Sequence, residues 1–202
     1  MDPSLRLATE EEKRARDRVT YAAWGEGLSL RQYLDREQQL RAHAWARDAM
    51  ETWLLCDRET IVCSCESLRM PSWCGGRDGT AYGIASVFTE EAHRGHRYAS
   101  QLVGEVATQL LARPTSQAVV LYSEVGAPIY ERAGFVVAPT VDWIVPAVAS
   151  APPRGLQLDD ELAIDAPSLR HADDFAIVPS AVQLDWHLAR ERYYASTRNR
   201  RA

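Results

Sequence analysis

The sequence predicts one α/β domain, in which helices and strands alternate along the chain, followed by a C-terminal helical extension. Its 202 residues fit a single domain or a domain with an added segment. Hydrophobic residues make up 46% of the chain and charged residues 25%, which is enough to bury a core. Segments with helical periodicity also alternate with short apolar runs typical of strands. We therefore divide the chain into a domain at residues 1–147 and an extension at residues 148–202.

The first part of the domain is predicted to contain a strand and two helices. Residues 4–8 have the pattern of a short strand. A helix follows Thr9, because residues 10–12 are all glutamate and negative charge stabilises the first turn of a helix. Gly25 ends that helix, and residues 29–50 form a second one with one broad apolar face. This face comprises Leu30, Tyr33, Leu34, Leu40, Ala44 and Trp45.

The middle of the domain changes to strand patterns. Residues 52–56 and 60–68 are apolar with alternation and predict a hairpin. Residues 71–80 are dense in glycine and proline, which is typical of a loop. Residues 81–88 are almost continuously apolar, as expected of a central strand buried on both faces.

The remainder of the domain predicts a helix, a strand, a short helix and a last strand. An amphipathic helix runs from about Tyr98 to Pro114, which cannot continue a helix. Residues 117–123 form a buried strand, a short helix is closed by Gly134, and residues 135–147 form the last strand. The apolar stripe of the long helix comprises Leu102, Val103, Val106, Leu110 and Leu111.

Charge and hydropathy exclude several classes of protein. The net charge of −5 argues against a broad nucleic-acid interface, which needs a clustered basic face. No stretch approaches the 18 or more apolar residues of a membrane span, and the N-terminal residues lack the apolar core of a signal peptide. We therefore expect a cytoplasmic protein that binds neither nucleic acid nor membrane.

The four cysteines are expected to be reduced thiols without a metal. Cys63 and Cys65 share one face of a predicted strand, whereas Cys56 lies in the preceding strand and Cys74 lies in the predicted loop. A zinc site usually has paired Cys-x-x-Cys or His-x3-5-His spacings, and these cysteines do not have them.

A cluster of basic residues separates the predicted strand at residues 81–88 from the long helix. Backbone N–H groups at a helix N-terminus, together with the helix dipole, bind anions. Gly95 would let the backbone turn tightly, and Arg94, His96 and Arg97 would add positive charge. The Walker pattern and GxGxxG are both absent from the sequence, so the segment indicates a phosphate site with fewer glycines than those motifs have. His93 and His96 are expected to face solvent or phosphate.

Two blocks of sequence resemble GNAT-superfamily N-acetyltransferases. VFTEEAHRGHRYASQLV is similar to their coenzyme A pyrophosphate signature, with an arginine, Arg97, where the middle glycine is usual. LYSEVGAPIYERAGF is similar to their later strand–helix block, with Ser123 in place of the common asparagine. The order of elements agrees over roughly residues 4–147. Within the superfamily, the two blocks and the late QLDWHLARERYY segment look most like fungal lysine N-acetyltransferases, which continue into a long second half where this chain ends.

The resemblance implies the GNAT fold, a mixed central sheet flanked by helices, with acetyl-CoA as cosubstrate and no metal. The strand at residues 81–88 would separate from the strand at 117–123, and the pantetheine arm would lie between them. Backbone groups near Ala85 and Phe88 would pair with that arm, and the N–H of Val87 would face the thioester oxygen. The pyrophosphate would be held by Arg94, Gly95, His96, Arg97, Tyr98 and Ala99.

Acetyl transfer to an amine also needs an acid for the leaving thiolate and a base for the amine. Tyr130 is the candidate acid, since the pKa of a phenol, near 10, lies only slightly above the pKa of a thiol, near 8.5. Glu124 is the nearest carboxylate by sequence and the candidate base. Tyr122 and Ser86 could instead order a water molecule for this step.

The predicted function is acetyl-CoA-dependent N-acetylation of a small primary amine, with an amino acid such as lysine as the first candidate acceptor. Negative net charge suits a cationic acceptor. Two alternatives stay open: another amine, such as a polyamine, an amino sugar or a biosynthetic intermediate, or a CoA-binding module without activity.

The extension is predicted to end in a helix at residues 180–195, after a linker rich in Pro, Ala and Asp. Leu184 and Leu188 lie on one stripe of this helix, which has to be buried. Either the helix folds back on its own core beside the acceptor site, which we favour, or it docks on a partner chain. A homodimer would bury what remains exposed. Trp186 and His187 are expected to pack, with the lining of the acceptor site as the alternative.

Overall fold

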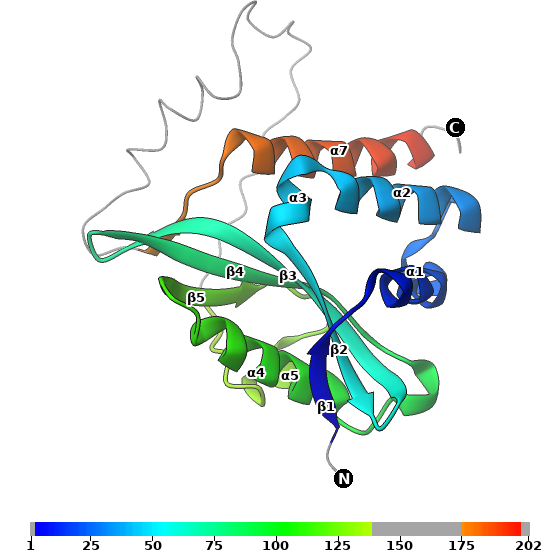
Figure 1. Cartoon of the computed structure of the whole chain (residues 1–202), viewed down its shortest axis with the longest axis horizontal. Coiled ribbons are helices and arrows are strands. Elements are labelled where there is room, and N and C mark those ends of the chain that lie inside the picture. The colour runs from blue at the N-terminus through cyan, green and yellow to red at the C-terminus, as the bar shows by residue number, and fades with distance from the viewer. Residues whose placement is uncertain (1–2, 139–174, 199–202) are drawn as a thin grey trace, which may run out of the picture.

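The structure, a computed structural model, describes residues 3–138 and 175–198 and contains a six-stranded mixed sheet between two layers of helices. Helices α1, α2, α3 and α7 lie on one face of the sheet, and α4 and α5 lie on the other (Figure 1). This arrangement confirms the predicted α/β class. Within the described residues, no helix is long and apolar enough to span a membrane.

The sheet is antiparallel except at one pair of strands. Its order is β1-β2-β3-β4-β5, with β6 paired to the far end of β3. Among the strands of the described residues, only β4 and β5 run parallel, and this pair adjoins the candidate site. The strands are β1 (Ser4–Leu7), β2 (Met50–Asp57), β3 (Thr60–Cys74), β4 (Arg77–Thr89), β5 (Ser116–Leu121) and β6 (Phe175–Ile177).

The loop predicted at residues 71–80 is instead the end of a long β3–β4 hairpin. Only Gly75 and Gly76 form its turn, both with positive φ (54° and 82°). Strand β6 pairs with β3 at Ser72–Cys74, so this end of β3 has a neighbour on each side. Long-range pairing therefore overrides the local turn signal, and Cys74 is a strand residue.

The helices begin at sequence-encoded caps. Thr9 and Glu12 form a reciprocal capping box at α1, and Ser29 and Gln32 form another at α2. The single helix predicted at residues 29–50 is wrong, because His43 leaves the helical conformation and its Nδ1 accepts a hydrogen bond from the backbone N–H of Trp45 (3.3 Å). The helices are α1 (Glu10–Trp24), α2 (Leu30–Ala42), α3 (Ala44–Ala49), the 3-10 helix η1 (Glu91–His93), α4 (Tyr98–Leu111), α5 (Ala127–Glu131) and α7 (Ala181–Arg198).

Two apolar clusters hold the layers together. The larger one packs α4 against β2, β3 and β4, and the predicted stripe of α4 is buried in it apart from Leu111, which is 52% exposed. Cys63 and Cys65 belong to this cluster, and burial raises the pKa of the Cys63 thiol to about 11. No group of three or more potential metal ligands occurs among residues 3–138 and 175–198.

The smaller cluster holds α7 on the chain's own core. Trp186 is 3% exposed, packs against Trp45 and donates its indole N–H to the carbonyl of Leu40 (3.0 Å). The helix thus folds back on its own core, and the expected packing of Trp186 is confirmed. Its predicted stripe is shifted, because Gln183 and Trp186 are buried whereas Leu188 is 47% exposed.

The last predicted strand, at residues 135–147, lies mostly outside the described residues, as does the linker that follows it. The described part, Phe135–Ala138, forms no strand. The strand predicted at residues 117–123 is shorter, ending at Leu121, and half-buried along its whole length. The domain boundary at residue 147 stays a prediction.

We predict that the packing of Trp186 contributes several kcal/mol to folding. Trp186→Ala should lower the free energy of unfolding by about 3–5 kcal/mol, because it leaves a cavity between α3 and α7. Chemical denaturation measures this change. Leu188→Ala on the exposed side of the same helix is the control, with an expected change below about 0.5 kcal/mol. Equal losses of unfolding free energy in the two variants would contradict the observed orientation of α7.

Candidate active site

The site begins where the parallel strands β4 and β5 separate. Their pairing ends at Ile84 and Leu121, but β4 continues to Thr89. Beyond Ile84, the edge of β4 that faces β5 has no ladder partner in the described part of the chain. Those backbone groups of Ala85–Phe88 that lie on this edge, and so do not face β3, are therefore available to a ligand, apart from the Ser86 carbonyl, which Arg16 binds.

A bulge in β4 lies at the same place. Ser64 pairs with Phe88 and Glu66 pairs with Ala85, so Ser86 and Val87 together oppose one residue of β3. Ser86 has a left-handed backbone conformation, with φ of 52°. Such a conformation costs free energy at a residue with a side chain and persists only where the surroundings hold it. We call residues Ala85–Phe88 the β4 bulge.

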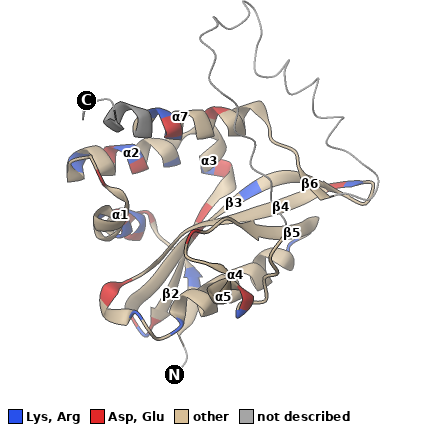
Figure 2. Ribbon diagram, turned by 180° about the vertical axis from the view of Figure 1, so that it is seen from behind, with Lys and Arg blue, Asp and Glu red and all other residues tan. Residues whose placement is uncertain are grey.

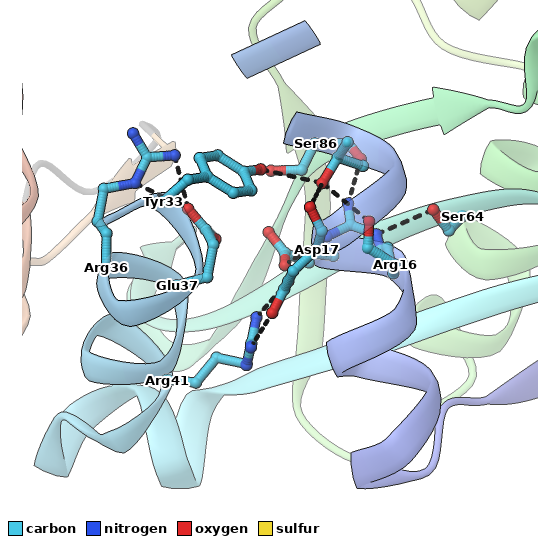
Figure 3. Close-up of polar contacts among 10 residues, drawn as sticks. Arg16, Asp17, Tyr33, Arg36, Glu37, Arg41, Ser64 and Ser86 are labelled. Atoms are coloured by element: carbon cyan, nitrogen blue, oxygen red, sulfur yellow. Dashed lines mark hydrogen bonds and ion pairs between the residues drawn. The ribbon is translucent and has the colours of Figure 1, made fainter. Parts of the chain in front are cut away.

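Arg16 of α1 binds the β4 bulge from the helical layer above it. Its side chain is only 6% exposed. The guanidinium donates to Ser64 Oγ (2.9 Å), to Glu66 Oε1 (3.0 Å) and to the carbonyl oxygen of Ser86 (2.7 Å), as Figure 3 shows for Ser64 and Ser86. One buried side chain thus joins α1 to two neighbouring strands.

Trp24 supports the same contact from the end of α1. Its ring packs edge-on against Phe88, with 5.8 Å between ring centroids. The Arg16 guanidinium carbon lies 5.8 Å from the centroid of the Trp24 ring. Helix α1 therefore contacts the β4 bulge through one cationic and one aromatic side chain.

Further polar groups lie between α1 and α2 (Figure 3). Asp17 binds Arg41, with one oxygen–nitrogen distance of 2.9 Å, and Thr20 Oγ1 lies 2.9 Å from the Tyr33 hydroxyl. Burial raises the pKa of Tyr33 to about 12. Glu37 binds Arg36, yet burial and the nearby Glu66 raise the pKa of the Glu37 carboxyl above its usual range.

Sequence analysis missed this polar network. In the sequence, the network is indicated by Glu66, a carboxylate within a predicted strand, and by Ser64 on the same face of that strand. On α1, Arg16, Asp17 and Thr20 share one buried face, so the helix buries its polar side rather than an apolar stripe.

The basic turn leads from β4 into α4. Gly95 has φ of 85° and Arg97 has φ of 65°, so the arginine adopts the conformation that glycine usually supplies. Arg97 is the N-cap of α4 but makes no side-chain cap. The N–H groups of the first turn, Tyr98–Ser100, thus have no acceptor in the part of the chain that the structure describes.

The side chains around that helix start are basic and accessible. Arg94, His96 and Arg97 are all exposed, and the His96 ring lies 5.6 Å from the ring of Tyr98. Elsewhere, α1 and α2 carry both acidic and basic positions (Figure 2). Free N–H groups, positive φ and positive charge together suit an anion such as a pyrophosphate.

Tyr130 lies on α5, which packs against α4. Its hydroxyl is 2.9 Å from Ser123 Oγ, which also accepts the backbone N–H of Val125. Tyr130 borders the same apolar cluster as Val87, Tyr98 and Ala99. The structure therefore gathers the β4 bulge, the start of α4 and Tyr130 around one cluster.

Glu124 is not held in the way that Tyr130 is. It lies in the exposed connection between β5 and α5 and makes no polar contact within residues 3–138 and 175–198. Its neighbour Tyr122 is 83% exposed. The hydroxyl of Tyr130, the candidate acid, is thus held by a hydrogen bond. The carboxylate of Glu124, the candidate base, has no such contact among the described residues.

A separate hollow lies at the other end of β4. Trp45 and Met70 line it together with Gly79, Thr80 and Val182. At about 3.3 Å per strand residue, Thr80 is about 20 Å from the β4 bulge. This hollow is therefore distinct from the candidate site.

The fold and these elements agree with the class that the sequence resemblance implied. Residues 4–138 match the acetyltransferase (GNAT) domain family. The chain therefore belongs to the GNAT acetyltransferase family, which confirms the recognition from sequence.

Individual relatives refine this comparison. A lysine acetyltransferase of Yarrowia lipolytica is 26% identical over 179 residues, which cover 76% of this chain. The match spans only 45% of that relative's own length. Among solved structures, a possible acetyltransferase of Clostridium difficile matches with a TM-score of 0.57, at 12% identity over 73% of this chain and 99% of that one. AAC(6')-Iy, solved with a CoA bisubstrate analogue, matches with a TM-score of 0.54, at 10% identity over 73% of this chain and 100% of that one.

Proposed function

We propose that this chain is an acetyl-CoA-dependent N-acetyltransferase that acts on a small primary amine, with lysine as the first acceptor to test. The observation that carries the proposal is the separation of β4 from β5 beside the free helix start of α4. A strand edge with unpaired backbone groups suits the amides of a pantetheine arm, and the adjoining turn suits a pyrophosphate. The residues present therefore fit coenzyme A.

Donor binding would use backbone groups more than side chains. Arg94, Gly95 and His96 would lead the chain around the pyrophosphate, and Arg97, Tyr98 and Ala99 would offer the first N–H groups of α4. Ala85 and Phe88 would pair with the pantetheine amides. The N–H of Val87 would bind the thioester oxygen, a contact that contributes about 2.7–4 kcal/mol at comparable oxyanion sites.

The reaction transfers the acetyl group from sulfur to nitrogen. The neutral amine attacks the thioester carbonyl, the C–N bond forms and the C–S bond breaks. The departing thiolate takes a proton from the Tyr130 hydroxyl, which Ser123 already orients. The amine loses its proton to a base, for which Glu124 is proposed, with a water molecule ordered by Ser86 and Tyr122 as the alternative.

Two observations bear on the identity of the acceptor. The Yarrowia relative is named a lysine acetyltransferase, and the net charge of −5 favours a cationic acceptor. Polyamines, amino sugars and biosynthetic amines remain alternatives, as does a CoA-binding module without activity. We also propose a cytoplasmic location, a homodimer and a position of α7 beside the acceptor site.

A thiol-release assay with acetyl-CoA and a panel of amines tests this function. We expect release of CoA with lysine or another small amine, at rates well above hydrolysis in its absence. Calorimetry with CoA accompanies the assay. CoA binding without turnover of any amine would favour the non-catalytic module, and absence of CoA binding would contradict the proposal.

Tyr130→Phe keeps the ring and removes the proposed proton donor. We expect kcat to fall by about 10²- to 10⁴-fold, the usual contribution of general acid catalysis, with unchanged affinity for acetyl-CoA. Ser123→Ala is the matched control, since it removes the partner but keeps the phenol, and most of kcat should remain. A Tyr130→Phe enzyme with wild-type kcat would show that Tyr130 only packs.

Substitutions at Arg97 separate its backbone conformation from its charge. Both Arg97→Gly and Arg97→Ala should weaken CoA binding about tenfold, because each removes the guanidinium. Only Arg97→Gly should also relieve the cost of positive φ, about 1–2 kcal/mol. Arg58 has φ of 57° in the β2–β3 turn, so Arg58→Gly is the control for strain alone. Wild-type CoA affinity in Arg97→Ala would exclude a role for the guanidinium.

A further inference from the structure

Arg16 makes one more contact with the β4 bulge than is needed to neutralise the charge of Glu66. A buried guanidinium beside Glu66 needs a partner, and the 3.0 Å ion pair supplies one. That pair alone does not require the third contact, the 2.7 Å hydrogen bond to the carbonyl of Ser86. This bond falls on the one residue of β4 that has a left-handed conformation.

The carbonyl of Ser86 and the N–H of Val87 belong to one peptide group. A peptide group is planar, and in its trans form the C=O and N–H bonds point in opposite directions. Because Arg16 holds this carbonyl toward α1, the N–H of Val87 points away from α1. A charged donor on the carbonyl oxygen also polarises the amide, which strengthens its N–H as a donor.

We propose that Arg16 is a positioning residue for acetyl transfer, which orients and polarises the Val87 N–H through the Ser86 carbonyl. The acetyl oxygen that this N–H binds gains negative charge as the amine attacks. A donor fixed in advance stabilises that charge without reorganisation in the transition state. The inference rests on the proposed function, in which the Val87 N–H is the oxyanion donor.

Glu66 and Ser64 keep the guanidinium in place for this task. Both side chains accept a hydrogen bond from Arg16. Together with the bond to the Ser86 carbonyl, they hold the planar guanidinium at three points on β3 and β4. A lysine would carry the same charge, but its ammonium lacks the planar fork that reaches acceptors on both strands. Arg16→Lys is therefore expected to lower kcat more strongly than it lowers the free energy of unfolding.

The main test is the double variant Arg16→Met/Glu66→Met. It removes both members of the buried ion pair, so no uncompensated charge remains to unfold the protein. Arg18→Met, at an exposed position on the same helix, is the matched control. Each variant is measured for kcat, for KM of the amine, for CoA affinity, and for the amide resonance and hydrogen exchange of Val87.

We expect kcat of the double variant to fall at least about tenfold, toward the roughly 10²- to 10³-fold loss seen on removal of an oxyanion donor. KM and CoA affinity should change much less, and the Val87 resonance should shift while the β2 and β3 amides stay protected. Arg18→Met should match wild type throughout. If the double variant fails to fold, Arg16→Lys provides the same readouts.

Wild-type kcat in a folded variant, or an unchanged Val87 resonance, would overturn the proposal. A purely structural role would lower the unfolding temperature without moving kcat. If the wild-type chain turns over no amine, the proposed function fails by itself. The Val87 resonance and exchange then still decide whether Arg16 orients this peptide.

Discussion

The three-point contact of Arg16 is the interaction on which the arrangement of the candidate site depends. It joins α1 to β3 and β4 inside the protein and holds a backbone conformation that costs free energy at a residue with a side chain. Loss of one member of a buried ion pair typically costs about 3–5 kcal/mol. Stability and the shape of the β4 bulge are therefore linked through the same guanidinium.

The second constraint is the end of parallel pairing between β4 and β5. Strand β5 ends at Leu121, and the chain then turns into α5, which brings Tyr130 against α4 and the core below β4. On the other side, β4 runs on into the basic turn, where Arg97 starts α4. Donor contacts would thus come mainly from main-chain groups, which every residue except proline supplies as both donor and acceptor.

Local signals allowed much of this fold to be predicted from sequence. The acidic first turn of α1, the stripe of α4 and the unusual arginine at position 97 all reflect neighbours in the chain. Errors arose where distant pairing decides. Strand β6 pairs with β3 at Ser72–Cys74, inside the Pro- and Gly-rich segment. On α7, contacts with α3 bury Trp186, whereas Leu188 is exposed.

The Arg16 network was hidden for the same reason. Its partners Ser64, Glu66 and Ser86 lie 48 to 70 positions away along the chain, so no local pattern joins them. Periodicity identifies apolar faces, whereas α1 buries a polar one. The base for the amine could not be assigned from sequence either, because proximity along the chain selected Glu124, which the fold leaves exposed.

We propose that coenzyme A lies between β4 and β5 with its pyrophosphate at the start of α4. Backbone amide NMR of the labelled full chain, titrated with CoA, tests it most directly. We expect the largest shifts at Ala85–Phe88 and Gly95–Ala99, with Thr80 and Val182 at the distant hollow unaffected. Saturable shifts centred on that hollow, with the β4 bulge unchanged, would contradict it.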